Sequence, residues 1–320
     1  MNRSLPLRHE DIEEISNYYG LSILDFQPMA GGASNSNYLL STQDEQLIVT
    51  VFDDKSFAHV SRLERLLRYL AVNGFSTTLI VPPDNERNPV MVYLNKPVLI
   101  KEYIPGDLCY SLERNMLIQV GGALGDLHQI PTPDFLPEEH AYGNQLFPSV
   151  VDENIDRVYE KWLSEQHEYL NRYLPIDLPQ CLIHGDLFAD NILFEGEELK
   201  AVIDFEEACQ YYRVFDLGMG IVGMCTDHGK VDLAKARAFI GGYQQVQNLE
   251  AGEILNLQHF AVYAAVATSY WRYWKFNIHA PDPDKAHLHR QMVEVANEVE
   301  SIAKDEFREA IFGYLDLVFE

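Results

Sequence analysis

The sequence predicts an α+β protein with two lobes, a small β-rich lobe at the N-terminus and a larger, mainly helical lobe after it. Apolar runs separated by polar turns fill most of residues 23–104, as expected for short strands. After the turn "PGD" at residues 105–107, most long segments have helical spacing of apolar residues instead. The 320 residues are enough for two such lobes around a large core.

The first lobe is expected to contain two helices and at least two strand pairs. "HEDIEEISNYYG" places apolar residues on one helical face and ends at Gly20, a common helix-ending residue. "NYLLS" and "LIVTVF" flank the polar turn "TQDEQ" and predict a hairpin. A helix over 57–74 follows, and then a strand pair formed by "VMVYL" and "PVLIKEYI". We therefore expect residues 1–100 to form the N-lobe and residues 101–106 to connect it to the next lobe.

The second lobe, residues 107–320, is predicted to be helical over 110–129, 152–173, 231–247, 252–277 and, with an interruption, 284–318. The exception is a small hairpin, in which "ILF" at 192–194 and "LKAVIDF" at 199–205 flank the turn "EGEE". This hairpin lies directly behind the polar run "HGDLFADN", so the run is expected to form a loop beside it.

Composition excludes several classes of partner. The net charge of −25 would repel a nucleic-acid backbone or an anionic bilayer, so neither is expected as a partner. The four cysteines, Cys109, Cys181, Cys209 and Cys225, form no C-x-x-C pair and fit reduced thiols. The N-terminus lacks the apolar core of a signal peptide, and "FAVYAAVATSYW" at 260–271 is too short to span a bilayer. A cytoplasmic location is expected.

Three oxygen-bearing side chains in or near "HGDLFADN" are expected to converge. Asp186 and Asn191 are five residues apart on the loop, and Asp204 ends the strand that pairs with the segment after the loop. Mg²⁺ prefers oxygen ligands and is usually held by one or two protein groups together with phosphate oxygens, which suits Asn191 and Asp204. Asp186 would then be free to accept a proton from a hydroxyl that attacks a γ-phosphate. Each residue alone would be read as a turn or cap residue, and Asp190 is read in that way.

The spacing H-x-D-x-x-x-x-N followed by I-D-F resembles the aminoglycoside phosphotransferase and choline kinase superfamily, and within it type II homoserine kinases most closely. The resemblance extends over most of the chain, through "GGASNSNYLL", "LIVTVF", "EYIPGD", "GGALGDLH", "LIHGDLFADNILF", "AVIDFEEAC", "VFDLG" and "RYW". It implies a protein-kinase-like bilobal fold, ATP as co-substrate and Mg²⁺. It also implies that Asp186 is the catalytic base, that Asn191 and Asp204 bind the metal, that His184 supports the loop and that Asp216 holds the loop's backbone.

Two further segments are predicted to contact the nucleotide. Glycines with small polar neighbours bring backbone N–H groups close to phosphates, which makes Gly31, Gly32, Ser34 and Asn35 candidates, although two glycines can equally form an ordinary turn. The resemblance places the adenine pocket at the connector, so that Lys101, Glu102, Tyr103 and Ile104 would line it. An ordinary strand end is the alternative there.

One position departs from the general kinase pattern. The strand "LIVTVF" should carry a lysine or arginine where Thr50 stands, to pair with nucleotide phosphates. Type II homoserine kinases also resemble this chain in having a threonine there. Lys55 could substitute for the missing cation, with a surface lysine as the alternative reading. The departure also leaves open a nucleotide-binding regulatory pseudokinase.

Substrate groups are expected from the second lobe. Arg272 stands among aromatic residues in "VATSYWRYWKF", so its charge should pair with a carboxylate of the protein or of a ligand. Glu206 and Glu207 are acidic enough to bind an ammonium group, or are solvated or capping residues. The sequence therefore predicts an ATP- and Mg²⁺-dependent kinase acting on the hydroxyl of a small amine or amino acid, with homoserine as first choice. Choline, ethanolamine, hydroxylysine and an aminoglycoside are the alternatives.

Overall fold

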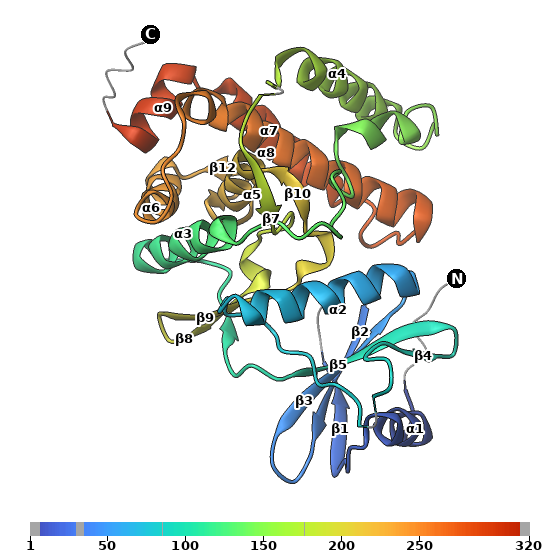
Figure 1. Ribbon diagram of the computed structural model, residues 1–320. Helices are drawn as coiled ribbons and strands as arrows, with labels where there is room; N and C mark the ends of the chain where they lie inside the picture. The colour runs from blue at the N-terminus through green and yellow to red at the C-terminus, as the bar shows by residue number, and fades with distance from the viewer. Residues whose placement is uncertain (1–6, 30–34, 85, 176, 314–320) are drawn as a thin grey trace. The chain divides into compact units, whose positions relative to one another are not determined.

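The computed structural model describes residues 7–29, 35–84, 86–175 and 177–313 (Figure 1). The chain divides into two compact units. Unit 1 comprises residues 1–106 together with 200–206, and unit 2 comprises residues 107–199 and 207–320. The segment 200–206, which the sequence pattern assigned to the second lobe, is therefore part of the first unit. None of the helices in the described ranges is long and apolar enough to cross a membrane.

Unit 1 is built on a five-stranded antiparallel sheet with the strand order β1-β2-β3-β5-β4 (Figure 1). The strands are β1 (Asp25–Pro28), β2 (Asn35–Ser41), β3 (Gln46–Phe52), β4 (Met91–Tyr93) and β5 (Lys96–Glu102). Helix α1 (His9–Tyr19) packs its buried residues Ile12, Ile15 and Tyr19 against side chains of these strands in one apolar cluster. Helix α2 (Phe57–Val72) contacts β5. Burial alternates along the second half of β2 and the first half of β3, whereas the end of β3 is buried throughout.

Unit 2 is mainly helical, as predicted. Its α-helices are α3 (Arg114–Gln129), α4 (Arg157–Tyr173), α5 (Arg213–Met224), α6 (Leu233–Gln244), α7 (Ala251–Tyr273), α8 (His289–Ser301) and α9 (Lys304–Phe312). A π-helix, Trp274–His279, continues α7, and 3₁₀ turns occur at Asn144–Val150 and Ala189–Asn191. The short strands include β6 (Asp107–Leu108), β7 (Gln180–Ile183), β8 (Ile192–Glu195), β10 (Cys209–Tyr212), β11 (Thr226–Asp227) and β12 (Lys230–Val231). The unit boundary falls within β9 (Glu198–Val202).

The predicted fold class, a β-rich N-terminal part followed by a mainly helical part, is confirmed. Helix α5 and the antiparallel pair β7–β10 were not predicted. Almost every side chain of α5 is buried, so the helix lacks the polar face that marks amphipathic helices in a sequence. The predicted helix over 152–173 begins only at Arg157, because the Asp156 side chain accepts a hydrogen bond from the backbone N–H of Tyr159 and caps α4.

The motif "GGALG" has a packing role in unit 2. Gly121 on α3 and Gly242 on α6 lie where these two helices cross, and a Cβ atom on either glycine would collide with a backbone carbonyl of the other helix. The glycines therefore allow the two helix backbones to approach closely. This contact fixes the end of α3, where His128 lies.

Candidate active site

The loop after β7 is held by a buried carboxylate. Asp216, in the first turn of α5, accepts hydrogen bonds from the backbone N–H groups of His184 (2.6 Å, to Oδ2) and Gly185 (2.8 Å, to Oδ1). His128 Nε2 lies 3.3 Å from Asp216 Oδ2, and both side chains are fully buried. Burial alone would raise the pKa of Asp216, but the hydrogen bond and charge of His128 hold it below its usual value. The loop's backbone thus rests on an ionised aspartate.

Gly185 is required at the turn of this loop. Its φ is +85°, in the left-handed region, and a Cβ atom there would lie 2.6 Å from the backbone oxygen of Glu207 and 3.1 Å from His140 Nε2. His140 Nε2 is 2.9 Å from the Gly185 carbonyl oxygen, and because a carbonyl only accepts, this nitrogen carries the proton. The "HGD" sequence therefore combines a buried histidine, a glycine that the turn requires and a partly buried aspartate.

Asp186 is partly buried and is positioned by several hydrogen bonds. The Tyr142 hydroxyl donates to Asp186 Oδ1 (2.9 Å), and the Asp186 backbone N–H donates to His184 Nδ1 (3.2 Å). Asn191 Nδ2 donates to the Asp186 backbone oxygen (2.8 Å), so the Asn191 carbonyl oxygen is directed away from this bond. Asp186 and Asn191, predicted to act together, therefore lie in direct contact.

Arg272, at the end of α7, is influenced by the charges of two aspartates in the same loop. Its Nη1 donates to the backbone oxygen of Leu288 (3.3 Å) and to Gln291 Oε1 (3.2 Å), both neutral acceptors. Burial lowers the pKa of the Arg272 guanidinium, while the negative charges of Asp186 and then Asp190 oppose this effect. The candidate base and the candidate carboxylate-binding group are thus electrostatically coupled within unit 2.

The remaining candidate metal ligand belongs to unit 1. Asp204 is exposed and has a φ of +66°, in the left-handed region that side chains other than glycine rarely adopt. Its neighbours fix this conformation: the Val202 N–H donates to the Ser76 oxygen (3.1 Å), and the Phe205 ring meets Phe75 edge-on at 5.8 Å. A strained, exposed aspartate held by its surroundings is typical of functional positions.

Comparison with known proteins identifies the family. Residues 25–249 match the model of the phosphotransferase enzyme family APH. The chain belongs to this family. Its curated relatives include homoserine kinases of Agrobacterium fabrum, 29% identical over 73% of this chain and 74% of the relative, and of Rhizobium etli, 28% identical over 76% and 78%. The chain is thus an enzyme, a phosphotransferase that acts on an alcohol group.

Solved structures support the fold at lower identity. A microcompartment-associated aminopropanol kinase matches with a TM-score of 0.71 and 17% identity, over 93% of this chain and 99% of that one. A choline kinase from Streptococcus pneumoniae matches with a TM-score of 0.68 and 16% identity, over 92% and 99%. The predicted resemblance to aminoglycoside phosphotransferases and choline kinases is therefore confirmed at the level of family and fold.

Within unit 1 of the phosphotransferase, Glu206 is engaged by other side chains. Asn35 Nδ2 donates to Glu206 Oε1, and Lys55 Nζ lies 3.7 Å from Glu206 Oε2. The Lys55 side chain is only 19% exposed, so it is not an ordinary surface lysine. Thr50 is buried, and its hydroxyl donates to Asn37 Oδ1 (2.7 Å). Thr50, where the general kinase pattern has a basic residue, is therefore hydrogen-bonded to Asn37. Lys55 lies three residues beyond the end of the same strand.

The other candidates are distributed as follows. Gly31, Gly32 and Ser34 lie outside the described residues. Lys101 is the second-last residue of β5. Burial lowers the pKa of its ammonium group, and the negative charges of Asp204 and then Glu206 oppose this shift. The Glu102 and Tyr103 backbone N–H groups donate to Leu79 (2.9 Å) and Gln46 (3.2 Å) within unit 1, and Ile104 is partly buried. Glu207, the first residue of the second segment of unit 2, is partly buried.

Two positioning residues were not found from the sequence. His140 and Tyr142 lie in the irregular segment between α3 and α4, and both contact the 185–186 turn. Their rings meet edge-on at 4.3 Å, which fixes the tyrosine beside Asp186. The segment "EEHAYGN" has no periodic pattern that would have indicated this contact.

Proposed function

We propose that the protein transfers the γ-phosphate of ATP to the hydroxyl group of L-homoserine, with Mg²⁺ as the metal. The position of Arg272 carries this proposal: its neighbour Trp271 lies against Tyr142, with ring centroids 6.4 Å apart, and the Tyr142 hydroxyl donates to Asp186. A group that can bind carboxylates therefore belongs to the same surroundings as a group that can accept protons. The curated relatives named above are homoserine kinases, which supports an amino-acid acceptor.

In the proposed reaction Asp186 accepts the proton of the acceptor hydroxyl as its oxygen attacks the γ-phosphorus, and ADP leaves. The Tyr142 hydroxyl orients the carboxylate, and the peptide groups around Gly185 hold it on a rigid turn. Arg272 would bind the acceptor's carboxylate through two parallel hydrogen bonds, which would align the acceptor for attack. Glu206 and Glu207 are both proposed to bind the acceptor's ammonium group, and Glu206 also pairs with Lys55.

The donor set fits the metal. Asn191 donates through Nδ2 to the Asp186 backbone, which leaves its carbonyl oxygen for a cation, and Asp204 offers an exposed carboxylate. An amide and a carboxylate are hard oxygen ligands of the kind that Mg²⁺ takes together with phosphate oxygens. When bound, the ion would neutralise charge on the β- and γ-phosphates. Gly31, Gly32, Ser34, Asn35 and residues 101–104 are proposed as contacts to ATP, and Lys55 is proposed to supply the cation that Thr50 does not.

The experiment is an assay of ADP release with a panel of acceptors: L-homoserine, choline, ethanolamine, hydroxylysine and an aminoglycoside. The proposal predicts the highest kcat/KM for L-homoserine. A preference for choline or ethanolamine would show that homoserine is not the acceptor, but the proposed kinase activity would stand. Binding of Mg·ATP without acceptor-dependent ADP release would identify a regulatory pseudokinase instead.

A further inference from the structure

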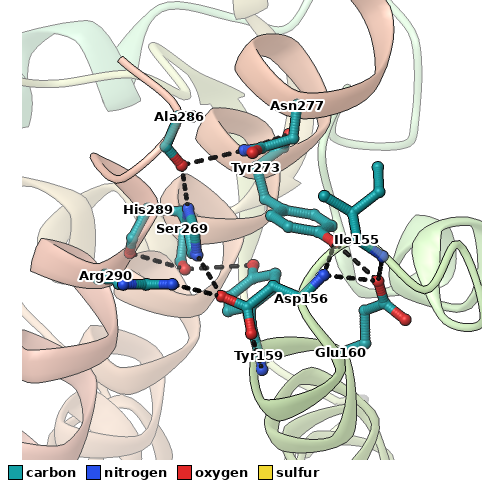
Figure 2. Close-up of polar contacts among 10 residues, drawn as sticks. All are labelled: Ile155, Asp156, Tyr159, Glu160, Ser269, Tyr273, Asn277, Ala286, His289 and Arg290. Carbon is teal, nitrogen blue, oxygen red and sulfur yellow. Dashed lines mark hydrogen bonds and ion pairs between the residues drawn. The ribbon is translucent and has the colours of Figure 1, made fainter. Parts of the chain in front are cut away.

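A cavity lies in unit 2, at the junction of α4, the π-helix and α8. It has a volume of about 430 Å³. Ile155, Asp156 and Val158 line it from the start of α4, and Asn277, His289 and Arg290 line it from the other side. Figure 2 shows the side chains of His289 and Arg290 both directed at the Asp156 carboxylate. None of these residues has a role in the reaction proposed above.

His289 has a defined tautomer and one unused nitrogen. Its Nδ1 lies 2.8 Å from the Ala286 carbonyl oxygen, which can only accept, so the proton is on Nδ1 (Figure 2). The side chain is 2% exposed, and within the described part of the chain Nε2 has no hydrogen-bond partner. Burial lowers the pKa of the imidazole, which keeps it neutral near pH 7. Nε2 is therefore a buried acceptor without a donor.

Close to this acceptor lies another acceptor, an oxygen of Asp156. Asp156 Oδ2 lies 3.8 Å from His289 Nε2 and accepts from Arg290 Nη2 at 2.8 Å. The other oxygen, Oδ1, caps α4 by accepting from the Tyr159 N–H (3.1 Å). Burial alone would raise the pKa of Asp156, but the hydrogen bonds from Arg290 and the Tyr159 N–H, together with the charge of Arg290, lower it, so the carboxylate is ionised. Two acceptors thus face each other across a gap that a single donor atom could bridge at about 2.8 Å from each.

The surrounding residues hold this gap open. The Glu160 carboxylate accepts from the N–H groups of Asn154 (3.1 Å), Ile155 (2.9 Å) and Asp156 (3.3 Å), which fixes the loop before α4. The Tyr273 hydroxyl donates to Glu160 and also accepts from the Asp156 N–H (Figure 2). The His289 ring packs against Tyr159 and Tyr273, with ring centroids 4.4 and 5.0 Å away. The two acceptors are therefore fixed in place.

We propose that Asp156 Oδ2 and His289 Nε2 bind the ammonium group of a small amino acid that enters this cavity. An ammonium group supplies several donors and a positive charge, which suit a carboxylate and a neutral imidazole nitrogen. The cations at the rim, Arg157 and Arg290, favour a ligand that also carries a carboxylate. Ile155 and Val158, 50% and 83% exposed, offer apolar surface to the carbon chain between the two charges. The inference is independent of which acceptor the kinase phosphorylates.

The test is a titration of the full chain, labelled with ¹⁵N in its histidine rings and observed by NMR without ATP. Three probes of equal chain length separate the charges: 4-aminobutyrate, n-butylamine and butyrate. Accepting a hydrogen bond changes the Nε2 resonance of His289, so 4-aminobutyrate and n-butylamine should shift it saturably and butyrate should not. Equal shifts with butyrate would overturn the proposal. No shift with any probe would also overturn it and would assign the gap to water.

Variants locate the binding at this cavity. Asp156→Asn keeps an N-cap residue but removes the charge, so 4-aminobutyrate should bind roughly tenfold more weakly or worse. The matched control is Asp232→Asn, which alters the N-cap aspartate of α6 and should leave binding unchanged. Arg290→Gln should strengthen n-butylamine binding relative to 4-aminobutyrate binding, because it removes a positive charge beside the ammonium site. Unchanged binding of both amines in Asp156→Asn would contradict the assignment.

Discussion

The Tyr142 hydroxyl donates a 2.9 Å hydrogen bond to Oδ1 of Asp186, the residue to which the sequence assigns proton transfer. Asp186 is thus held at both its backbone and its side chain. Such restraint is what a general base needs, since its carboxylate must meet a hydroxyl in one orientation.

Replacing Asp186 by asparagine should remove proton transfer but keep the shape of the loop. We expect kcat with L-homoserine to fall about 10²- to 10⁴-fold, the usual effect of losing a general base. Nucleotide affinity, measured by calorimetry, should stay the same. Asp190→Asn is the matched control, four residues further along the same loop, and should change kcat by less than about threefold. A kcat of Asp186→Asn equal to that of the parent would remove Asp186 from the mechanism.

Asp204→Ala tests the metal. Only one carboxylate and one amide are proposed as protein ligands, so losing the carboxylate should abolish the part of nucleotide affinity that depends on Mg²⁺. Calorimetry with ATP in Mg²⁺ and in EDTA measures that part directly. Parent and variant should bind equally weakly in EDTA. If they bind equally well in Mg²⁺, Asp204 is not a ligand.

Arg272→Lys separates two roles of the arginine. A lysine cannot form two parallel bonds to a carboxylate, so the KM for L-homoserine should rise about tenfold or more with the KM for ATP unchanged. If the arginine instead serves only to join α7 to Leu288 and Gln291, the melting temperature should fall and the KM should stay. That second outcome would remove the main reason to prefer homoserine over choline.

Gly185→Ala should destabilise unit 2. Left-handed backbone costs a residue with a side chain about 1–2 kcal/mol, and the clash with the Glu207 oxygen adds a further loss, for about 2–5 kcal/mol in all. Gly196 also has a positive φ, +62°, but a Cβ there meets nothing within 4 Å. Gly196→Ala should therefore lower the free energy of unfolding only by the cost of the left-handed backbone. Urea unfolding of both variants measures the difference, and equal losses would refute the steric argument.

His140 should give the protein a pH-dependent stability. Burial lowers its pKa in the folded protein, so below the unfolded value of about 6.5 the unfolded chain binds a proton that the folded chain does not. The free energy of unfolding should therefore fall as pH decreases from about 7, by at most about 1.4 kcal/mol per pH unit for this group. His140→Gln keeps a donor for the Gly185 carbonyl and should flatten this slope. An identical pH profile in parent and variant would contradict the assignment.

The β-rich unit was predictable because its strands are short apolar runs separated by polar turns and its helices end close to Gly20 and Gly74. The predicted hairpin of "NYLLS" and "LIVTVF" is β2 and β3, with Thr50 opposite Asn37. Helix α5 has no such signal, since its side chains are buried on all sides. Strands β7 and β10 have four residues each and pair across the whole catalytic loop, a separation that local patterns do not reveal.

The candidate site shows the same limit. The order H-x-D-x-x-x-x-N within one loop was enough to predict that His184, Asp186 and Asn191 lie together, because neighbouring residues in a tight loop must be close. Tyr142 is 44 residues from Asp186, and His128 is 88 residues from Asp216. Neither partner has a local pattern that marks it, and only the packing of α3, α5 and the irregular 130–156 segment brings them to the loop.

The central claim is that Asp186 accepts the proton of the homoserine hydroxyl while the hydroxyl oxygen attacks the γ-phosphorus of ATP. Its most direct test is ³¹P NMR of the purified protein with Mg·ATP and L-homoserine, run beside the Asp186→Asn variant. The account predicts a phosphomonoester signal that grows in step with ADP in the parent and is nearly absent in the variant. Unchanged ATP in the parent, or its conversion to inorganic phosphate alone, would contradict the account.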